Sequence, residues 1–133
     1  MTSLELVQQY YEHFNQQNWE GMLACLEPEI RHDANQGSTH TGLDNYRKFL
    51  QHMDECYQET LTDMVFMVDA TGDRVAVEFV VTGIYKKTDG DLPVATGQSY
   101  TLPAGAFLAV ANGKITRVTT YYNLPLWIEL ISE

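Results

Sequence analysis

Asp33 is the residue of this sequence best suited to acid–base chemistry. It follows a short run of strand-like residues and precedes a loop that contains Gly37. A carboxylate in an apolar pocket loses hydration, which raises its pKa and makes it a usable general base. The alternative is that Asp33 only caps the turn at residues 35–37, a common role for aspartate.

Three polar residues beside Asp33 are candidate binding residues. Adjacent residues of a strand point to opposite faces, so we expect His32 to face away if Asp33 faces a pocket. Asn35 and Gln36 can orient a ligand through their amide groups, or they can simply satisfy the backbone of the loop.

Tyr10 is the candidate hydroxyl donor. It belongs to an apolar stripe with Val7, Tyr11 and Phe14 at helical spacing, so we expect its ring to lie inside the protein. A buried phenol needs a hydrogen-bond partner, which can be a ligand carbonyl or a backbone group.

The sequence contains no motif typical of a metal or nucleotide site. His52, Glu55 and Cys56 have a spacing that could chelate a metal, but the neighbouring Gln51 and Asp54 make this region look like an ordinary polar helix face. His-Glu-x-x-His, Cys-x-x-Cys and Gly-rich phosphate motifs are all absent from the sequence. We therefore predict no metal and no cofactor.

Helical patterns occupy the first half of the chain. Thr2 and Glu5 have the spacing of a capping box, and Asn18 can cap a second helix that ends before Pro28. Residues 30–36 indicate a brief strand or extended piece, and residues 37–42 a loop. A second apparent capping box, at residues 41–44, precedes a third helix with apolar positions 46, 49, 50 and 53.

Strand patterns occupy the second half. Residues 64–68 and 75–85 are rich in β-branched and aromatic side chains, a turn at 71–73 separates them, and a polar loop follows at 86–93. Residues 99–110 and 115–123 flank Asn112-Gly113, a strong hairpin signal because both central positions of that turn have positive φ. Helices followed by a meander of four long strands indicate a single α+β domain over residues 1–133, and Leu126, Trp127, Leu130 and Ile131 suggest one last short helix.

Charge and composition exclude several classes of protein. Eight basic against eighteen acidic residues give a net charge of −10, so we expect neither a nucleic-acid nor an anionic-membrane partner. No apolar run approaches the roughly 18 residues of a spanning helix, and the first residues lack the basic charge of a signal peptide. We expect Cys25 and Cys56 to be reduced thiols in a cytoplasmic protein, although the sequence leaves a disulfide open.

Several short motifs, taken in order and with their spacing, resemble the nuclear transport factor 2-like superfamily, and more closely its ketosteroid isomerase-related, or SnoaL-like, branch. They are Val7-Gln8-Gln9-Tyr10, Phe14-Asn15, Trp19-Glu20-Gly21, residues 32–37, Gly42, residues 102–107, Gly113-Lys114-Ile115 and Tyr121-Tyr122-Asn123. The resemblance implies a cone-shaped, curved antiparallel (mixed) β-sheet wrapped around N-terminal helices, the nuclear transport factor 2-like or cystatin-like fold. It also implies a pocket for a small, mostly apolar molecule and a homodimer formed through the sheet.

The resemblance further implies roles for individual residues. It places a functional tyrosine of the isomerases at Tyr10 and their catalytic aspartate base at Asp33. Their protonated acid, which donates to the enolate oxygen, falls on Gly105, so steroid isomerisation of the usual kind is not expected. Tyr122 is a candidate replacement for that donor. The inherited register points six residues inward as pocket walls: Val77, Phe79, Val81, Phe107, Thr120 and Tyr122.

We therefore predict a small cofactor-free enzyme of the isomerase or cyclase type. In this prediction Asp33 removes a proton α to a carbonyl and Tyr10 stabilises the enolate. One alternative is a non-catalytic protein that binds a small apolar molecule. Another is a dimeric interaction module whose cavity is collapsed by large side chains.

Overall fold

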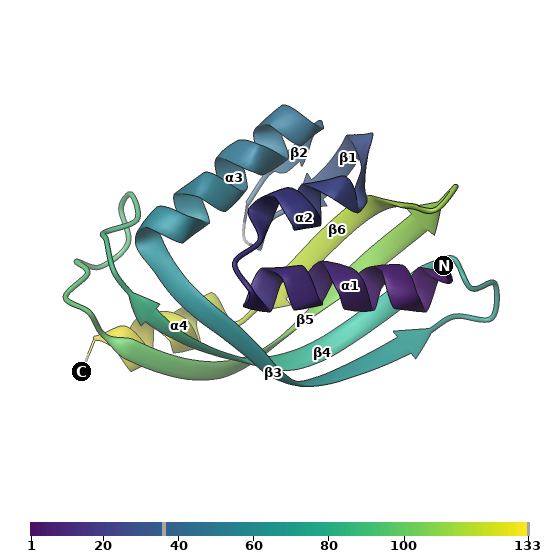
Figure 1. Cartoon of the computed structure of the whole chain (residues 1–133). Coiled ribbons are helices and arrows are strands. Elements are labelled where there is room, and N and C mark those ends of the chain that lie inside the picture. The colour runs from purple at the N-terminus through teal and green to yellow at the C-terminus, as the bar shows by residue number, and fades with distance from the viewer. Residues whose placement is uncertain (36, 133) are drawn as a thin grey trace.

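The computed structural model describes residues 1–35 and 37–132, and in this part of the chain a curved six-stranded sheet carries helices on its concave side (Figure 1). The elements in chain order are α1 (Ser3–Asn15), α2 (Trp19–Ala24), β1 (Leu26–Asp33), β2 (Thr39–Thr41), α3 (Leu43–Cys56), β3 (Tyr57–Val68), β4 (Arg74–Tyr85), β5 (Ser99–Ala111), β6 (Lys114–Tyr122) and α4 (Leu124–Ile131). The predicted α+β class is confirmed.

The strands lie in the order β2-β1-β6-β5-β4-β3. Strands β3 to β6 form the predicted antiparallel meander, whereas β1 pairs in parallel with β6 and antiparallel with β2. The prediction of a four-stranded sheet is therefore wrong: β1, which overlaps the brief strand predicted at residues 30–36, and β2 extend the sheet beyond β6. The mixed character of the sheet is confirmed.

Local signals explain where several elements begin. Thr2 and Glu5 form the predicted capping box at the start of α1, and Asn18 caps α2 by accepting a hydrogen bond from the Gly21 amide at 3.0 Å. The turn between β5 and β6 contains Asn112 and Gly113 at φ 52° and 74°, as the hairpin signal predicts.

Three predicted boundaries are wrong. The second helix was expected to include Leu26 and to be stopped by Pro28, but it ends at Ala24 and both residues lie inside β1. The capping box at residues 41–44 does not form: Thr41 ends β2, and Gly42, at φ 93°, precedes α3 without a side-chain cap. Strand β3 begins at Tyr57, seven residues before the predicted start, because polar residues on its exposed face hide the alternation.

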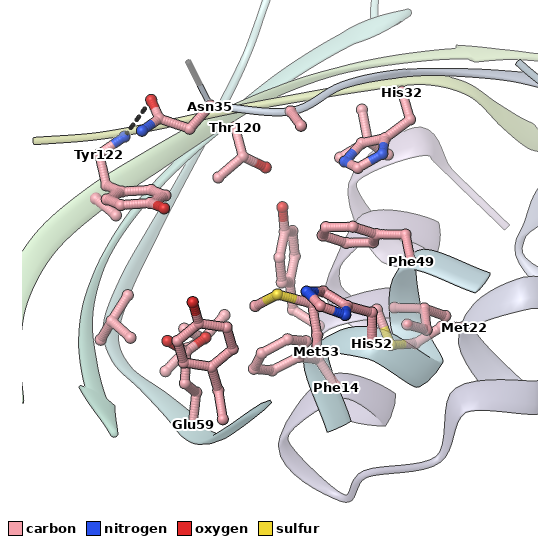
Figure 2. A pocket seen from close by; sticks show the side chains of 18 of the residues that line it. Phe14, Met22, His32, Asn35, Phe49, His52, Met53, Glu59, Thr120 and Tyr122 are labelled. Atoms are coloured by element: carbon pink, nitrogen blue, oxygen red, sulfur yellow. Dashed lines mark hydrogen bonds between the residues drawn. The ribbon is translucent and has the colours of Figure 1, made fainter. Parts of the chain in front are cut away.

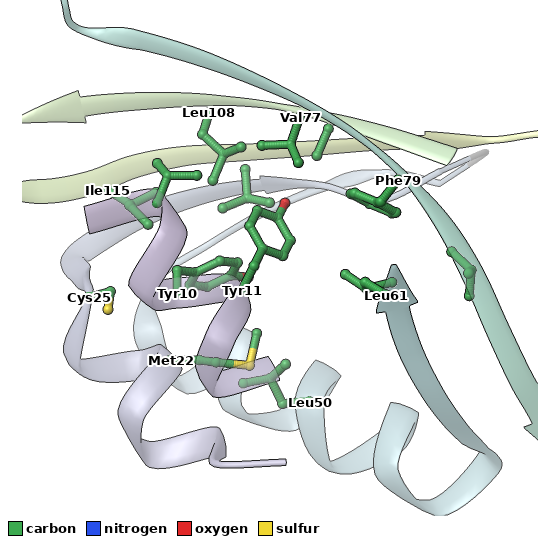
Figure 3. Packing of buried hydrophobic residues seen from close by; sticks show 14 of the residues in the cluster. Tyr10, Tyr11, Met22, Cys25, Leu50, Leu61, Val77, Phe79, Leu108 and Ile115 are labelled. Carbon is green, nitrogen blue, oxygen red and sulfur yellow. The ribbon is translucent and has the colours of Figure 1, made fainter. Parts of the chain in front are cut away.

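Buried apolar side chains of α1, α2 and α3 pack on the concave face of the sheet (Figure 3). Val77, Leu108 and Ile115 lie under this layer on β4, β5 and β6 and are almost completely buried. Cys25 and Cys56 are both free and buried, as expected of reduced thiols. None of the helices in the two described ranges is long and apolar enough to cross a membrane.

Candidate functional site

A cavity of about 290 Å³ opens between α1, α3, α4 and the concave face of the sheet (Figure 2). This volume is close to the lower limit of typical small-molecule sites, which is about 300 Å³. Ten of the lining residues are aromatic: Tyr10, Tyr11, Phe14, Trp19, Tyr46, Phe49, Tyr57, Phe79, Tyr122 and Trp127. The walls therefore suit a flat, mostly apolar molecule, and polar chemistry is confined to a few groups.

The side chains of Tyr10, Tyr46 and His32 form a polar cluster in the wall of the cavity. The hydroxyls of Tyr10 and Tyr46 share a hydrogen bond, and burial raises the pKa of both phenols. The His32 ring packs against Tyr46 and Phe49 with centroids 4.9 and 4.3 Å apart. Burial lowers the pKa of His32 to about 4, so all three groups are neutral at neutral pH.

Glu59 supplies a carboxylate to the same cavity. It projects from β3, and its Oε2 accepts a hydrogen bond from the Tyr100 hydroxyl at 2.6 Å. Burial raises the pKa of Glu59 above its ordinary value, and the hydrogen bond from Tyr100 offsets part of this rise. In the described part of the chain, Oε1 has no hydrogen-bond partner, so it is available to a ligand.

Glu59 was not among the predicted site residues, because residues 57–63 were predicted to lie outside any strand, whereas β3 begins at Tyr57. Tyr57, Glu59 and Leu61 alternate with exposed polar residues, so they share the face that lines the cavity. This period of two was the available signal. It was weak because a glutamate occupies a position that an apolar residue usually fills.

An asparagine provides a directed donor at another part of the cavity. Asn35 Oδ1 accepts a hydrogen bond from the Tyr122 amide at 3.1 Å (Figure 2). Its Nδ2 is buried and has no hydrogen-bond partner among the described residues. Thr120 lines the cavity beside Asn35, and the predicted binding residue Gln36 lies outside the described residues.

The predicted orientations of His32 and Asp33 are wrong, because the structure exchanges them. Asp33 pairs with Thr119 across β1 and β6, and both face the outer side of the sheet, whereas His32 and its partner Val118 line the cavity. Asp33 accepts hydrogen bonds from the hydroxyls of Thr119 at 2.6 Å and Thr39 at 2.7 Å, and from Arg31 Nε at 3.1 Å. These bonds lower the pKa of Asp33 to about 2, the opposite of the predicted rise.

The same register corrects two other predictions. Ala104 and Ala106 face inward on β5, so Gly105 and Phe107 face outward, and Phe107 is 47% exposed beside Tyr121. The position assigned to the missing acid therefore does not face the cavity. Of the other predicted wall residues, Phe79, Val81, Thr120 and Tyr122 line the cavity, while Val77 is buried in the core.

Replacing Asp33 with Asn is expected to destabilise the protein by about 1 to 3 kcal/mol at pH 7, where the hydrogen bonds to the charged carboxylate are lost. The folded pKa of about 2 lies below the ordinary value of 3.8, so this stabilisation is complete above that value and is lost as the pH falls through 2. Urea unfolding of both proteins between pH 2 and 7 measures the difference. A difference that does not shrink at low pH would contradict the assignment.

A cavity between helices and the concave face of a curved mixed sheet defines the nuclear transport factor 2-like class of α+β proteins. The chain belongs to the SnoaL-like domain family, which matches residues 7–118. No curated protein sequence matches it.

Solved structures agree with this assignment. A putative polyketide cyclase from Xanthomonas campestris pv. campestris is 48% identical, with 96% of this chain and 95% of that chain covered and a TM-score of 0.93. A putative polyketide cyclase from Pseudomonas putida KT2440 is 46% identical, with 98% of each chain covered and a TM-score of 0.97. A putative ketosteroid isomerase from Kribbella flavida is 27% identical, with 90% of this chain and 76% of that chain covered and a TM-score of 0.65.

Proposed function

We propose that this SnoaL-like protein binds a small, mostly apolar carbonyl compound in the cavity and transfers a proton α to its carbonyl group. The observation that carries the proposal is Glu59: one carboxylate oxygen is held by Tyr100, and the other is available in an aromatic cavity. Burial raises the pKa of Glu59, which strengthens it as a base. The similarity to putative polyketide cyclases supports the same class of reaction.

In the proposed reaction, Glu59 takes the α-proton and the electron pair moves onto the carbonyl oxygen as an enolate. A hydroxyl of the Tyr10–Tyr46 pair donates a hydrogen bond to that oxygen, since both phenols are protonated and line the cavity. Glu59 can then return the proton to another carbon, which isomerises the substrate. Alternatively, the enolate carbon attacks a second carbonyl, and Glu59 protonates the new alkoxide, which closes a ring.

Exchange of α-hydrogens for deuterium tests this proposal with simple ketones in place of the natural substrate. Small aryl ketones, with 2-tetralone as the reference, are incubated with the protein in D₂O and followed by NMR. We expect exchange faster than in buffer and faster than with unfolded protein. Ketones that bind, as measured by quenching of tryptophan fluorescence, but exchange no faster than in buffer would overturn the catalytic proposal.

A non-catalytic binding protein is the second candidate. It is favoured by Asp33, whose carboxylate is engaged by hydroxyl groups on the outer face of the sheet instead of facing the cavity. Binding without exchange would support this candidate. The cavity beside Tyr10 does not support the alternative of a dimeric interaction module with a collapsed cavity.

We further propose that two copies associate through the outer face of the sheet. Phe107 and Tyr121 support this proposal because they form an exposed aromatic pair on that face, with ring centroids 5.9 Å apart. The molecular mass in solution, measured by light scattering, tests it.

The two free thiols support a location in the reducing cytoplasm.

A further inference from the structure

We propose that His52, Cys56 and Asp89 form a binding site for a divalent transition-metal ion of the zinc class at the edge of the cavity. One ligand atom of each residue lies within 4.8 Å of the other two. His52 Nε2 is 2.7 Å from Asp89 Oδ1 and 4.0 Å from Cys56 Sγ. His52 and Cys56 lie on α3, and Asp89 lies on the loop between β4 and β5.

The chemistry of the three side chains favours zinc over magnesium or calcium. A thiolate and an imidazole are ligands of zinc, cobalt and related ions, whereas magnesium and calcium prefer oxygen ligands. The thiolate and the carboxylate together carry two negative charges, which neutralise a divalent cation. His52 and Cys56 are four residues apart on α3, the spacing that places side chains on one helix face.

The distances are compatible with one tetrahedral ion after small side-chain movements. Two ligands of one zinc ion lie roughly 3.3 to 3.7 Å apart, given bond lengths of about 2.0 to 2.3 Å. To bind one ion, the distance between His52 Nε2 and Asp89 Oδ1 would increase from 2.7 Å, and the distance between His52 Nε2 and Cys56 Sγ would decrease from 4.0 Å. Each change is about 1 Å or less.

Asp89 is held in place by groups other than His52. The Tyr57 hydroxyl donates to Asp89 Oδ2 at 2.7 Å, and the Asp89 amide donates to the Tyr85 hydroxyl at 2.9 Å. The rings of Tyr57 and Tyr85 stack at 5.4 Å, and the Tyr85 hydroxyl donates to the Pro93 carbonyl at 2.7 Å. The carboxylate is therefore oriented in advance, as hydrogen bonds from neighbouring groups orient the ligands of known metal sites.

The neighbouring lysines do not block the site. Lys87 Nζ lies 3.5 Å from Glu55, and Lys86 Nζ donates to the Asp54 carbonyl. Glu55, which sequence spacing grouped with His52 and Cys56, pairs with Lys87, and Asp89 is the third member of the cluster instead. The prediction of an ordinary polar helix face did not foresee this third ligand, because Asp89 is 33 residues from Cys56.

An ion at this site would have a coordination position toward the cavity. His52 and Asp89 both line the cavity, and Figure 2 shows the His52 imidazole projecting from α3 among its lining side chains. Three protein ligands with one open position is the arrangement of catalytic zinc sites, in which the ion can hold a water molecule or a ligand oxygen. Metal binding at this site would add to the proposed proton transfer and would not require it.

Titration of the chelator-treated protein with Co²⁺ tests the site, because a cobalt–thiolate bond gives a charge-transfer absorption in the near ultraviolet. We expect the absorption to saturate at one ion per chain and to disappear when Zn²⁺ is added. Cys56→Ser should abolish it, and the matched variant Cys25→Ser should retain it. Tyr57→Phe keeps the three ligands but releases the carboxylate, so we expect about 10-fold weaker binding.

Asp89→Asn is a second variant, on a loop, that should weaken cobalt binding even if Cys56→Ser folds poorly. Circular dichroism shows which variants are folded. A folded wild-type protein without the thiolate absorption, or an absorption that persists in Cys56→Ser, would overturn the site. Weak binding that none of these substitutions changes would identify adventitious surface binding and would overturn it as well.

Discussion

Glu59→Gln is expected to slow the exchange of ketone α-hydrogens by about 10²- to 10⁴-fold, the usual contribution of a general base. Glutamine has nearly the same shape and can still accept the hydrogen bond from Tyr100, so ketone binding should change little. The measurement compares exchange rates at saturating ketone with dissociation constants from tryptophan fluorescence. A variant that binds and exchanges like the wild type would show that Glu59 is not the base.

Two further variants sharpen this experiment. Glu55→Gln removes an exposed carboxylate outside the cavity, and we expect no change in the exchange rate. Tyr100→Phe removes the hydrogen bond that lowers the pKa of Glu59. Because the base must be ionised, the rate rises with pH through the pKa of Glu59, and this rise should move to higher pH in Tyr100→Phe. If the pH dependence of the exchange rate does not shift in Tyr100→Phe, Glu59 is not the group whose ionisation controls the rate.

Trp127→Ala is expected to destabilise the protein by about 3 to 5 kcal/mol, the typical cost of truncating a buried aromatic side chain. Trp127 is 4% exposed on α4, and its ring makes edge contacts with Tyr57, Tyr85 and Tyr100 at 5.9, 5.0 and 5.8 Å. For a domain of this size, the melting temperature should fall by about 10 to 20 °C. Thermal and urea unfolding followed by circular dichroism measure both quantities.

The matched control is Leu126→Ala, because Leu126 is the preceding residue of α4 but only half-buried. Leu126→Ala should lower the free energy of unfolding clearly less than Trp127→Ala does. If both variants lower it equally, the apolar surface of α4 as a whole stabilises the helix, and the three aromatic contacts of Trp127 contribute no more than its other contacts.

The sequence predicts the fold well because its periodicities are local. The capping box at Thr2, the helical stripe through Tyr10 and the Asn112-Gly113 turn each depend on residues close in the chain, and each is confirmed. The boundaries that failed depend on distant partners. Strand β2 has three residues and is stabilised by pairing with β1, which no local pattern of its sequence reveals.

The site was harder to predict because a shift of one residue exchanges the two faces of a strand. The placement of Asp33 inward and of Phe107 in the wall both rested on an inherited register. The observed pairing of Asp33 with Thr119, and of Thr119 with Phe107, places all three on the outer face. Glu59 was signalled only by a weak alternation in β3, and Asp89 is held beside the cavity by a hydrogen bond from Tyr57, a tertiary contact that sequence spacing does not encode.

The parallel pairing of β1 with β6 constrains the order in which this chain can fold. It joins Leu26 to Ile115 and Asp33 to Thr119, residues almost ninety positions apart, whereas the meander from β3 to β6 closes through neighbouring hairpins. Closing a long loop costs more chain entropy than closing a short one, and non-local contacts slow folding. During synthesis, β1 leaves the ribosome long before its parallel partner β6, whereas α1 can pack on β3 and β4 before β6 is made. Strand β1 is thus made early and joins the long strands of the sheet late.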